Sequence, residues 1–489
     1  DGSLIGSTDG LFGNIEYIRS GYALETDAND DYFVRYLDKN SGDHIKNMQT
    51  NKTYSVLMQA IMDATSGDTL QVTRDYFESD GAYIQNGKEI TIDFNGKKMS
   101  IVSSISNSGT LILKNSKESG LNLNSYSSSG IVNSGTLELN NIVMNASITN
   151  LSNLKVNSSS ITGSNGINSY GSGNGAGLEI NNSKIYGESQ GIYCNSPISM
   201  KDSYVYSKER VFYYGERNNT QSDITNTDFH SENVLSSSAF YNYGNLNLTN
   251  VSTNTGINNT GTLSFKDGSI GSMILNSYNM TLDNISIDMN FVSSESTGYY
   301  SPLINNSGQN LEIKNSKINI NVNLPQNTII GILNSGTLKM SDTSYNLSTD
   351  GENNEMTFGI LNNYGVFTLS GIEFNLNSKK SITGIYSNSS STLDFESGSV
   401  SVNSLKDAKG VLISGGTFNL GTPDSVDNEL YGTLNGDVNL ENPKITANGT
   451  STGVGIDINY GYFNYYDGLI KGNTLAKNAV PANIEFKYR

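Results

Sequence analysis

The feature that most constrains the fold is a short frame of residues that recurs along the chain. It holds an apolar residue, an asparagine, a turn with glycine, and two apolar residues spaced two apart. Two-residue alternation is a strand signal, so each copy predicts short strands joined by sharp turns, with positive φ tolerated at the Asn-x-Gly bend. Copies span residues 105–113, 131–139, 240–248, 257–265, 304–313, 332–340, 360–369 and 412–420.

The spacing of these copies predicts a solenoid. Gly244 and Gly261 are 17 residues apart, whereas Gly308 and Gly336 are 28 apart, and periods in this range are typical of stacked repeats. One repeat cannot bury its apolar side alone, so the repeats must stack, with equivalent leucines in one interior file and equivalent asparagines in amide ladders. Parallel β-to-β connections are overwhelmingly right-handed. We therefore expect an all-β, right-handed parallel β-helix whose interior file includes Leu111, Leu137, Leu263 and Leu338.

The start of the solenoid is marked by a helical pattern. Residues 53–65 have apolar side chains at helical spacing and are followed by Gly67, which predicts a short helix capping the open N-terminal end. Strand-like alternation then begins near Thr69 and continues to about Lys471. We expect a junction over residues 1–50, a β-helix with its capping helix over 51–472, and a C-terminal tail or cap over 473–489.

The two ends of the chain are similar to each other. Residues 1–8 align with residues 467–474 at a constant offset of 466, and residues 14–17 resemble residues 483–486 after a three-residue slip. This similarity predicts that the chain runs from the tail of one module to the tail of the next in a tandem array. Chance matching in a biased composition is the alternative.

Composition excludes several classes of function. The formal net charge is −17 and no basic stretch occurs, so nucleic acid is not an expected partner. No apolar run is long enough to span a membrane. The single cysteine, Cys194, allows neither an intrachain disulfide nor a zinc cluster, and it is predicted to fill a core position. We expect no cofactor and no metal.

Catalysis requires an explicit test, because glycoside hydrolysis needs two facing carboxylates and a polysaccharide lyase needs a carboxylate cluster with a base. The segment 226–228, followed by His230, weakly resembles a polygalacturonase motif, but a turn is the simpler interpretation. His44 and His230 are expected to be exposed. No catalytic residue is predicted, because the acidic residues of the repeats share no position in the frame and most of them are expected in turns, namely Asp267, Asp283, Asp288, Asp342 and Asp394.

The most unusual segment, 204–217, combines aromatic rings with charged residues in a sparsely charged chain. Tyrosine offers both apolar area and a hydrogen-bonding group, which suits recognition of sugars or proteins. A pair of strands with tyrosine packed along the outside is the alternative. The candidate ligand-binding residues are Tyr204, Tyr206, Arg210, Tyr213, Tyr214 and Arg217.

Residues 54–100 resemble the N-terminal cap of pectate-lyase-like β-helices in large bacterial surface proteins. Residues 331–338 and 459–468 are similar to repeats in adhesin-like exported proteins of Gram-positive gut bacteria. The resemblance implies a secreted, non-catalytic module, monomeric within its array, that presents or spaces a binding face for a host or bacterial surface glycan or protein. A polysaccharide lyase or glycoside hydrolase of the pectate-lyase-like class is the alternative.

Overall fold

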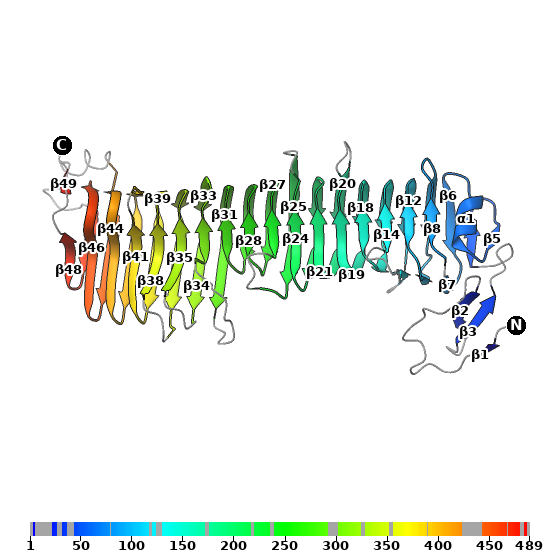
Figure 1. The fold of residues 1–489 in the computed structure, drawn as a ribbon, viewed down its shortest axis with the longest axis horizontal. Coiled ribbons are helices and arrows are strands. Elements are labelled where there is room, and N and C mark those ends of the chain that lie inside the picture. The colour runs from blue at the N-terminus through cyan, green and yellow to red at the C-terminus, as the bar shows by residue number, and fades with distance from the viewer. Residues whose placement is uncertain are drawn as a thin grey trace, which may run out of the picture. The chain divides into compact units, whose positions relative to one another are not determined.

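The protein is almost entirely β (Figure 1). The computed structural model describes residues 3–4, 22–26, 32–36, 44–78, 80–116, 120–123, 130–171, 176–216, 220–234, 239–291, 302–323, 328–351, 356–388, 390–422, 443–466, 468–479 and 484–486. The one helix among these residues is α1 (Leu57–Asp63). The chain divides into two compact units, unit 1 (Asp1–Asn233) and unit 2 (Val234–Arg489).

Unit 1 contains a small antiparallel sheet and a long, mostly parallel one. The small sheet consists of β1 (Ser3–Leu4), β3 (Tyr32–Tyr36) and β2 (Tyr22–Thr26), in that order. The long sheet begins with β4 (Ile45–Asn47), β5 (Thr53–Tyr54), β6 (Asp68–Val72), β7 (Tyr76–Glu78), β8 (Ala82–Ile84), β9 (Glu89–Asp93), β10 (Met99–Ile101), β11 (Ile105–Asn107) and β12 (Thr110–Lys114). It continues with β13 (Leu121–Leu123), β14 (Ile131–Asn133), β15 (Thr136–Asn140), β16 (Val143–Asn145), β17 (Ile148–Asn150), β18 (Asn153–Asn157), β19 (Ser160–Ser169), β20 (Gly177–Asn181), β21 (Lys184–Cys194), β22 (Ile198–Lys201), β23 (Tyr204–Ser207), β24 (Arg210–Tyr214) and β25 (Gln221–Ser231).

Unit 2 is built from parallel strands of the same kind, several of which are longer. Its first strands are β26 (Phe240–Asn242), β27 (Asn245–Thr253), β28 (Ile257–Asn259), β29 (Thr262–Ile270), β30 (Ile274–Asn276), β31 (Asn279–Phe291), β32 (Ile304–Asn306), β33 (Asn310–Lys314), β34 (Lys317–Val322), β35 (Thr328–Asn334), β36 (Thr337–Ser341) and β37 (Ser344–Thr349). The remainder are β38 (Met356–Asn362), β39 (Val366–Ser370), β40 (Ile372–Ser378), β41 (Ser381–Ser387), β42 (Thr392–Phe395), β43 (Gly398–Ser404), β44 (Asp407–Leu420), β45 (Lys444–Gly449), β46 (Thr452–Tyr465), β47 (Leu469–Gly472), β48 (Leu475–Ala479) and β49 (Ile484–Phe486).

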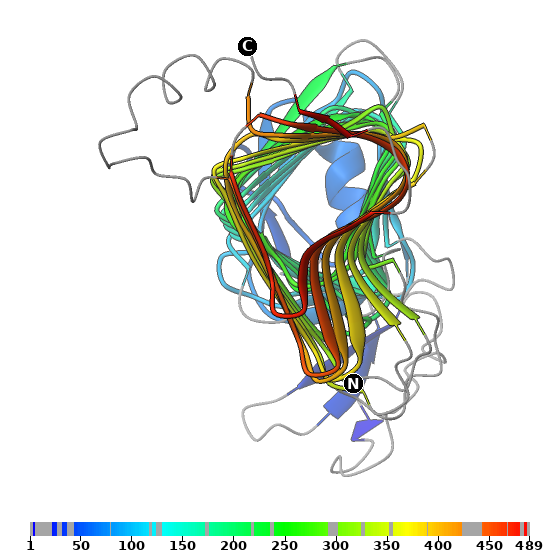
Figure 2. The same ribbon diagram turned by 90° about the vertical axis from the view of Figure 1, so that its left-hand side faces the viewer.

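Equivalent strands of successive repeats pair in register, so each repeat forms one tier of the sheet. In unit 1, Leu111 pairs with Leu137, which pairs in turn with Leu154. In unit 2, Leu311 pairs with Leu338. The tiers of unit 2 are seen end-on in Figure 2, where the yellow, orange and red strands lie over one another. The four leucines of the predicted interior file are at most 1% exposed, namely Leu111, Leu137, Leu263 and Leu338, which confirms their burial within each unit.

Buried asparagines form the amide ladders that the frame predicts. In unit 1, Nδ2 of Asn107 donates to Oδ1 of Asn133 over 2.7 Å, and Asn133 donates in the same way to Asn150. The ladder then passes to Ser169. Unit 2 has a longer ladder, with donor-to-acceptor distances of 2.7 to 2.9 Å, through Asn242, Asn259, Asn276, Asn306, Asn334 and Asn362. A buried amide would be costly without partners, so the ladder fixes the register of the tiers.

The glycine of the frame is required by close approach between tiers, which differs from the expected positive φ. A Cβ atom added at Gly135 would lie 2.0 Å from the carbonyl oxygen of Gly109, and one at Gly336 would lie 1.8 Å from that of Gly308. Neither glycine has a φ in the left-handed region. The asparagine two residues earlier, Asn133, instead accepts a hydrogen bond from the Gly135 amide, which closes the bend.

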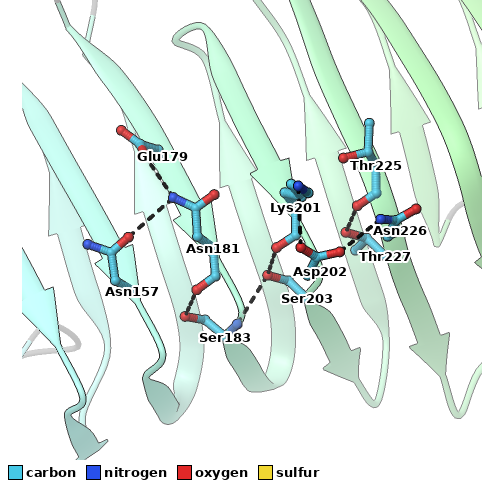
Figure 3. A network of polar contacts seen from close by, with 10 residues as sticks. All are labelled: Asn157, Glu179, Asn181, Ser183, Lys201, Asp202, Ser203, Thr225, Asn226 and Thr227. Carbon is cyan, nitrogen blue, oxygen red and sulfur yellow. Dashed lines mark hydrogen bonds and ion pairs between the residues drawn. The ribbon is translucent and has the colours of Figure 1, made fainter.

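Positive φ is found at a different corner, which lies either just after a strand, as at Asn182 and Asp202, or within one, as at Asn226 in β25. Asn182, Asp202 and Asn226 have φ between 47 and 52° at equivalent places in successive tiers. Asn226 donates to the Asp202 carboxylate over 2.8 Å, and the hydroxyl of the next residue, Thr227, donates a hydrogen bond to the Thr225 carbonyl (Figure 3). Asparagine and aspartate tolerate this conformation better than other side chains do, which explains their recurrence here.

The N-terminal end of the long sheet is antiparallel. β4 pairs with both β5 and β6, and α1 lies against β4, β5 and β8 with Leu57, Ala60 and Ile61 buried. The helix is shorter than the expected span of 53–65, because Thr53 and Tyr54 pair with β4 as a strand. Strand pairing of the long sheet starts at Ile45, inside the span expected to be a junction.

The C-terminal end continues the parallel pairing beyond residue 472. β48 and β49 both pair in parallel with β46, at Val454 with Leu475 and at Phe463 with Ile484. The predicted equivalence of residues 1–20 and 467–489 falls mostly outside the described residues.

Candidate functional site

The described part of the segment selected from the sequence, residues 204–216, belongs to unit 1, where parallel register aligns outward aromatic residues of neighbouring tiers. On β21, β23 and β25, Tyr186 pairs with Tyr206, and Tyr206 pairs with His230. The residues preceding them, Ile185, Val205 and Phe229, are at most 1% exposed. Because side chains alternate along a strand, burial of these three turns Tyr186, Tyr206 and His230 outward.

The first aromatic strip consists of Tyr186, Tyr204, Tyr206 and His230. The ring of Tyr186 lies 5.9 Å from that of Tyr204 and 6.0 Å from that of Tyr206, both tilted. Tyr206 stacks on His230 with centroids 5.9 Å apart and donates its hydroxyl to the Glu232 carboxylate. That hydrogen bond is the main cause of a raised pKa at Tyr206, whereas desolvation raises the pKa of Tyr204. These two phenols are thus neutral hydrogen-bonding groups at physiological pH.

The second aromatic strip consists of Tyr170, Tyr193 and Tyr213. Tyr193 and Tyr213 pair between β21 and β24, and their rings stack with centroids 4.5 Å apart and planes inclined by 5°. Tyr170 tilts against Tyr193 at 5.2 Å. The guanidinium of Arg210 lies 5.8 Å from the centre of the Tyr213 ring, within cation–π range. The strip presents a continuous aromatic surface with one positive charge beside it.

The structure divides the predicted cluster. Tyr204 and Tyr206 belong to β23, whereas Arg210 and Tyr213 belong to β24, so they lie in two strips instead of one site. Tyr214 is wrong as a ligand-binding residue: it is 0% exposed, because alternation along β24 turns it inward. Its hydroxyl is hydrogen-bonded to that of Ser222 at 2.7 Å, and burial raises its pKa.

Arg217, the sixth candidate, lies outside the described residues. Four residues of the two strips were not selected from the sequence: Tyr170, Tyr186, Tyr193 and His230. Each is separated from its stacking partner by about one repeat, so a search for aromatic residues at the repeat spacing would have found them. These residues cannot be found from one contiguous segment of the sequence, because they lie on neighbouring tiers.

The histidine and cysteine expectations had mixed outcomes. His230 is exposed as predicted, but His44 is 0% exposed and its ring stacks on Tyr76 at 5.0 Å, so that prediction is wrong. Cys194 is buried, which confirms its predicted core position, and burial raises the pKa of its thiol to about 11. A thiol of that pKa is a poor nucleophile.

The acidic residues compared for catalysis occupy unlike places. Asp267 and Asp342 have a positive φ, as expected of turn residues, although Asp267 is inside β29. Asp283, Asp288 and Asp394 lie within strands and have no positive φ, so the expectation of a turn is wrong for them. The polygalacturonase-like segment begins with Asn226, which is also a positive-φ corner residue. Over the ranges that the structure describes, no group of three or more His, Cys, Asp or Glu side chains is placed to hold a metal ion.

No known family matches the chain, and neither the curated proteins nor the solved structures include a match. In the part of the chain that the structure describes, no helix is both long and apolar enough to cross a membrane.

Proposed function

We propose that the chain is a non-catalytic module of a secreted bacterial surface protein, adhesin-like in role, that presents a binding face to a host or bacterial glycan or protein. The observation that carries this proposal is the pair of aromatic strips on unit 1. The stacked rings of Tyr193 and Tyr213 are partly exposed and lie beside the Arg210 cation. Tyrosine and arginine are enriched where proteins bind partners, because both combine contact area with hydrogen-bond donors.

The architecture that we propose for the module is a right-handed parallel β-helix with α1 as its N-terminal cap. Register pairing of equivalent strands and the buried ladders support the helix, and contact of α1 with β4, β5 and β8 supports the cap. Such a scaffold is stiff, because within each unit the described tiers bond to their neighbours through backbone and, at the ladders, through side chains. It suits a role in spacing a binding face away from a cell within a tandem array.

The test is binding of the purified chain to an array of glycans and to extracellular matrix proteins. We expect at least one ligand, with affinity reduced about ten-fold or more in the double variant Tyr193→Ala/Tyr213→Ala, because losing both rings removes an aromatic contact on the order of 2 to 3 kcal/mol. The matched control is Tyr83→Ala, a tyrosine of unit 1 that is 43% exposed and belongs to neither strip. Equal loss in the control, or no ligand at all, would count against the proposal.

A carbohydrate-active enzyme of the pectate-lyase-like class is the second candidate. The observation that favours an enzyme is an acid beside the first strip. Asp228 on β25 pairs with Tyr204 on β23 and lies two residues before His230. This alternative is tested by incubating the chain with pectin, alginate and glycosaminoglycans and assaying for reducing or unsaturated ends. We expect no product. Product formation that Asp228→Asn abolishes would replace the binding proposal with this one.

A further inference from the structure

A second outer surface, on unit 2, has a different chemistry. It covers the outward face of β31, β34, β37, β40, β43, β45 and β47, which pair in that order, each parallel to the next. We call this surface the amide groove. Its members come from strands that are far apart in sequence, and the strand register alone brings them together.

Two files of polar side chains run across the tiers of the amide groove. The first file begins with Asp288, which accepts from Asn319 over 2.6 Å, and continues through Asn346 and Asn375 at 3.0 and 3.3 Å. The second file lies two residues further along each strand. In it Asn321 donates to Asn290 over 3.3 Å, and Ser348 holds the next position. Beyond Ser348, Asn403 donates to Asn377 and Asn448 donates to Asn403, each over 3.1 Å.

The surface is hollowed along this array. A cavity of about 280 Å³ lies over the files from Asp288 to Asn377. A second cavity, of about 460 Å³, shares Asn377 with it and extends to Asn448 and Asn473. A third, of about 570 Å³, shares Asn448 and Asn473 and extends to Lys471. The three are neighbours with shared lining residues, and together they follow the face of seven strands, which at about 4.8 Å per strand is about 30 Å long.

The hydrogen bonds within the files leave capacity for a ligand. A primary amide has two N–H donors and two acceptor lone pairs, and a ladder bond uses one donor and one lone pair of each interior member. Asn321, Asn377 and Asn448 are exposed, so their remaining groups face the groove. A ligand with alternating donors and acceptors, repeated at the spacing of the tiers, would match this array.

Charge and apolar area narrow the ligand class further. The acids of the groove, Asp288 and Asp350, nearly balance its lysines, Lys379, Lys444 and Lys471, so no strong field of one sign selects an ion. Leu405 lines the groove and is 65% exposed. Hydroxyl groups hydrogen-bond both as donor and as acceptor, and the C–H face of a sugar ring packs on an aliphatic side chain.

An extended peptide fits less well. Peptides that add to sheets bond to the unpaired backbone of an edge strand. The amide groove is the face of a sheet whose strands are paired on both sides from β34 to β45, so their backbone groups are used within the sheet.

We propose that the amide groove binds a linear, uncharged polysaccharide that lies across the tiers, with about one sugar ring per strand and its hydroxyl groups bonded to the two asparagine files. The site is separate from the aromatic strips of unit 1. Its occupancy does not depend on whether those strips bind a ligand.

The experiment is affinity electrophoresis of the full chain in gels containing soluble linear polysaccharides. The uncharged probes are a mixed-linkage glucan, a glucomannan and a xylan; the acidic probes are alginate and polygalacturonate. We expect at least one uncharged polysaccharide to retard the migration of the chain. This retardation should be insensitive to 0.5 M salt, because no ion pairs form with an uncharged ligand. The double variant Asn377→Ala/Asn403→Ala should weaken polysaccharide binding about ten-fold or more, because it removes the hydrogen-bonding groups of two amides.

The matched control is Asn363→Ala/Asn388→Ala, which removes a ladder pair of 2.9 Å outside the groove, and its retardation should be unchanged. Leu405→Asp is a second groove variant at an exposed position, so its effect does not depend on folding, and it too should weaken binding. Tyr193→Ala/Tyr213→Ala should bind as the unmodified chain does, which separates this site from the aromatic strips. No retardation by any uncharged probe, salt-sensitive retardation by acidic probes alone, or unchanged binding in both groove variants would overturn the proposal.

Discussion

The outer faces of the two units differ although their interiors are alike. Unit 1 exposes stacked rings, such as Tyr193 on Tyr213, whereas unit 2 exposes hydrogen-bonded amides, such as Asn319 on Asp288. The interior of each unit holds buried apolar files and an asparagine ladder of the same kind. Register pairing therefore aligns whatever residue type recurs at a position. Burial constrains the inward residue type, whereas the outward residue type is free to vary.

The largest expected effect tests whether the interiors are equivalent. Leu137→Asp in unit 1 and Leu263→Asp in unit 2 each place a carboxylate at a position at most 1% exposed. Each should lower the free energy of unfolding by several kcal/mol, since a buried charge has no partner there. Urea unfolding followed by circular dichroism measures this, with the outward Glu138→Gln as control. A tolerated aspartate in one unit alone would break the equivalence.

A pH effect should distinguish unit 1 from unit 2. Glu78 is 1% exposed, accepts hydrogen bonds from the Leu57 amide and the Tyr76 hydroxyl, and has a pKa raised by burial from 4.5 to about 8. The folded state thus holds a proton that the unfolded state releases. Its stabilising contribution is complete below pH 4.5 and is lost as the pH rises to about 8, by a few kcal/mol at about 1.4 kcal/mol per pKa unit.

Hydrogen exchange at several pH values, corrected for the intrinsic rate, measures this effect. Protection of α1 and β4–β7 should fall between pH 5 and pH 8, whereas protection of the unit 2 strands should change less. Glu78→Gln should remove the pH dependence. A fall of the same size in both units, or one that persists in Glu78→Gln, would contradict the assignment to Glu78.

The two ladders should respond differently to loss of one member. Asn259 donates to Asn276 and to the Asn279 carbonyl and accepts from Asn242, so Asn259→Ala leaves several buried groups unbonded. We expect a loss of about 2 to 4 kcal/mol. Ser169 ends the ladder of unit 1 and has fewer such bonds, so Ser169→Ala should lose about 1 kcal/mol. Thermal unfolding of the two variants measures the loss of stability in each. Equal losses in Asn259→Ala and Ser169→Ala would mean that the ladder does not stabilise the fold through its amides.

Substitutions on the outer faces are expected to have the smallest effect on the free energy of unfolding. Tyr213→Ala removes a stacked ring and should lower the free energy of unfolding by about 1 kcal/mol. Asn321→Ala removes one solvent-exposed amide and should change it by less than about 0.5 kcal/mol. Chemical denaturation measures both. A loss above about 2 kcal/mol for Asn321→Ala would assign the amide files a structural role in place of a binding one.

Predictions that rest on the repeat itself match the structure. Asn107 with Asn133 and Leu111 with Leu137 hold the same place in their frames, and each pair is adjacent in the sheet. The reason is physical: a strand has a side-chain period of two, so once two copies align, every inward and outward position is fixed. The bounds of α1 were less accurate, because tertiary pairing of Thr53 and Tyr54 with β4 overrides local helical periodicity.

Predictions about the candidate site succeeded only in part, since contiguity in sequence is a poor guide to a surface built across tiers. Tyr213 and Tyr214 are neighbours in sequence, yet one faces solvent and the other the core. His44 could not be recognised as buried, because its contact with Tyr76 joins segments outside any repeat.

The sequence by itself determined the strand class, the tiered pairing and the burial of the leucine and asparagine files, because these follow from a local pattern repeated many times. Only the tertiary structure decided which outward residues meet. Repeats in this chain vary in length, so the distance from Asn321 to Asn290 or from Tyr213 to Tyr193 along the chain is not constant. The loops absorb that variation while hydrogen bonding between strands keeps the register, and the resulting alignment creates the aromatic strips and the amide groove.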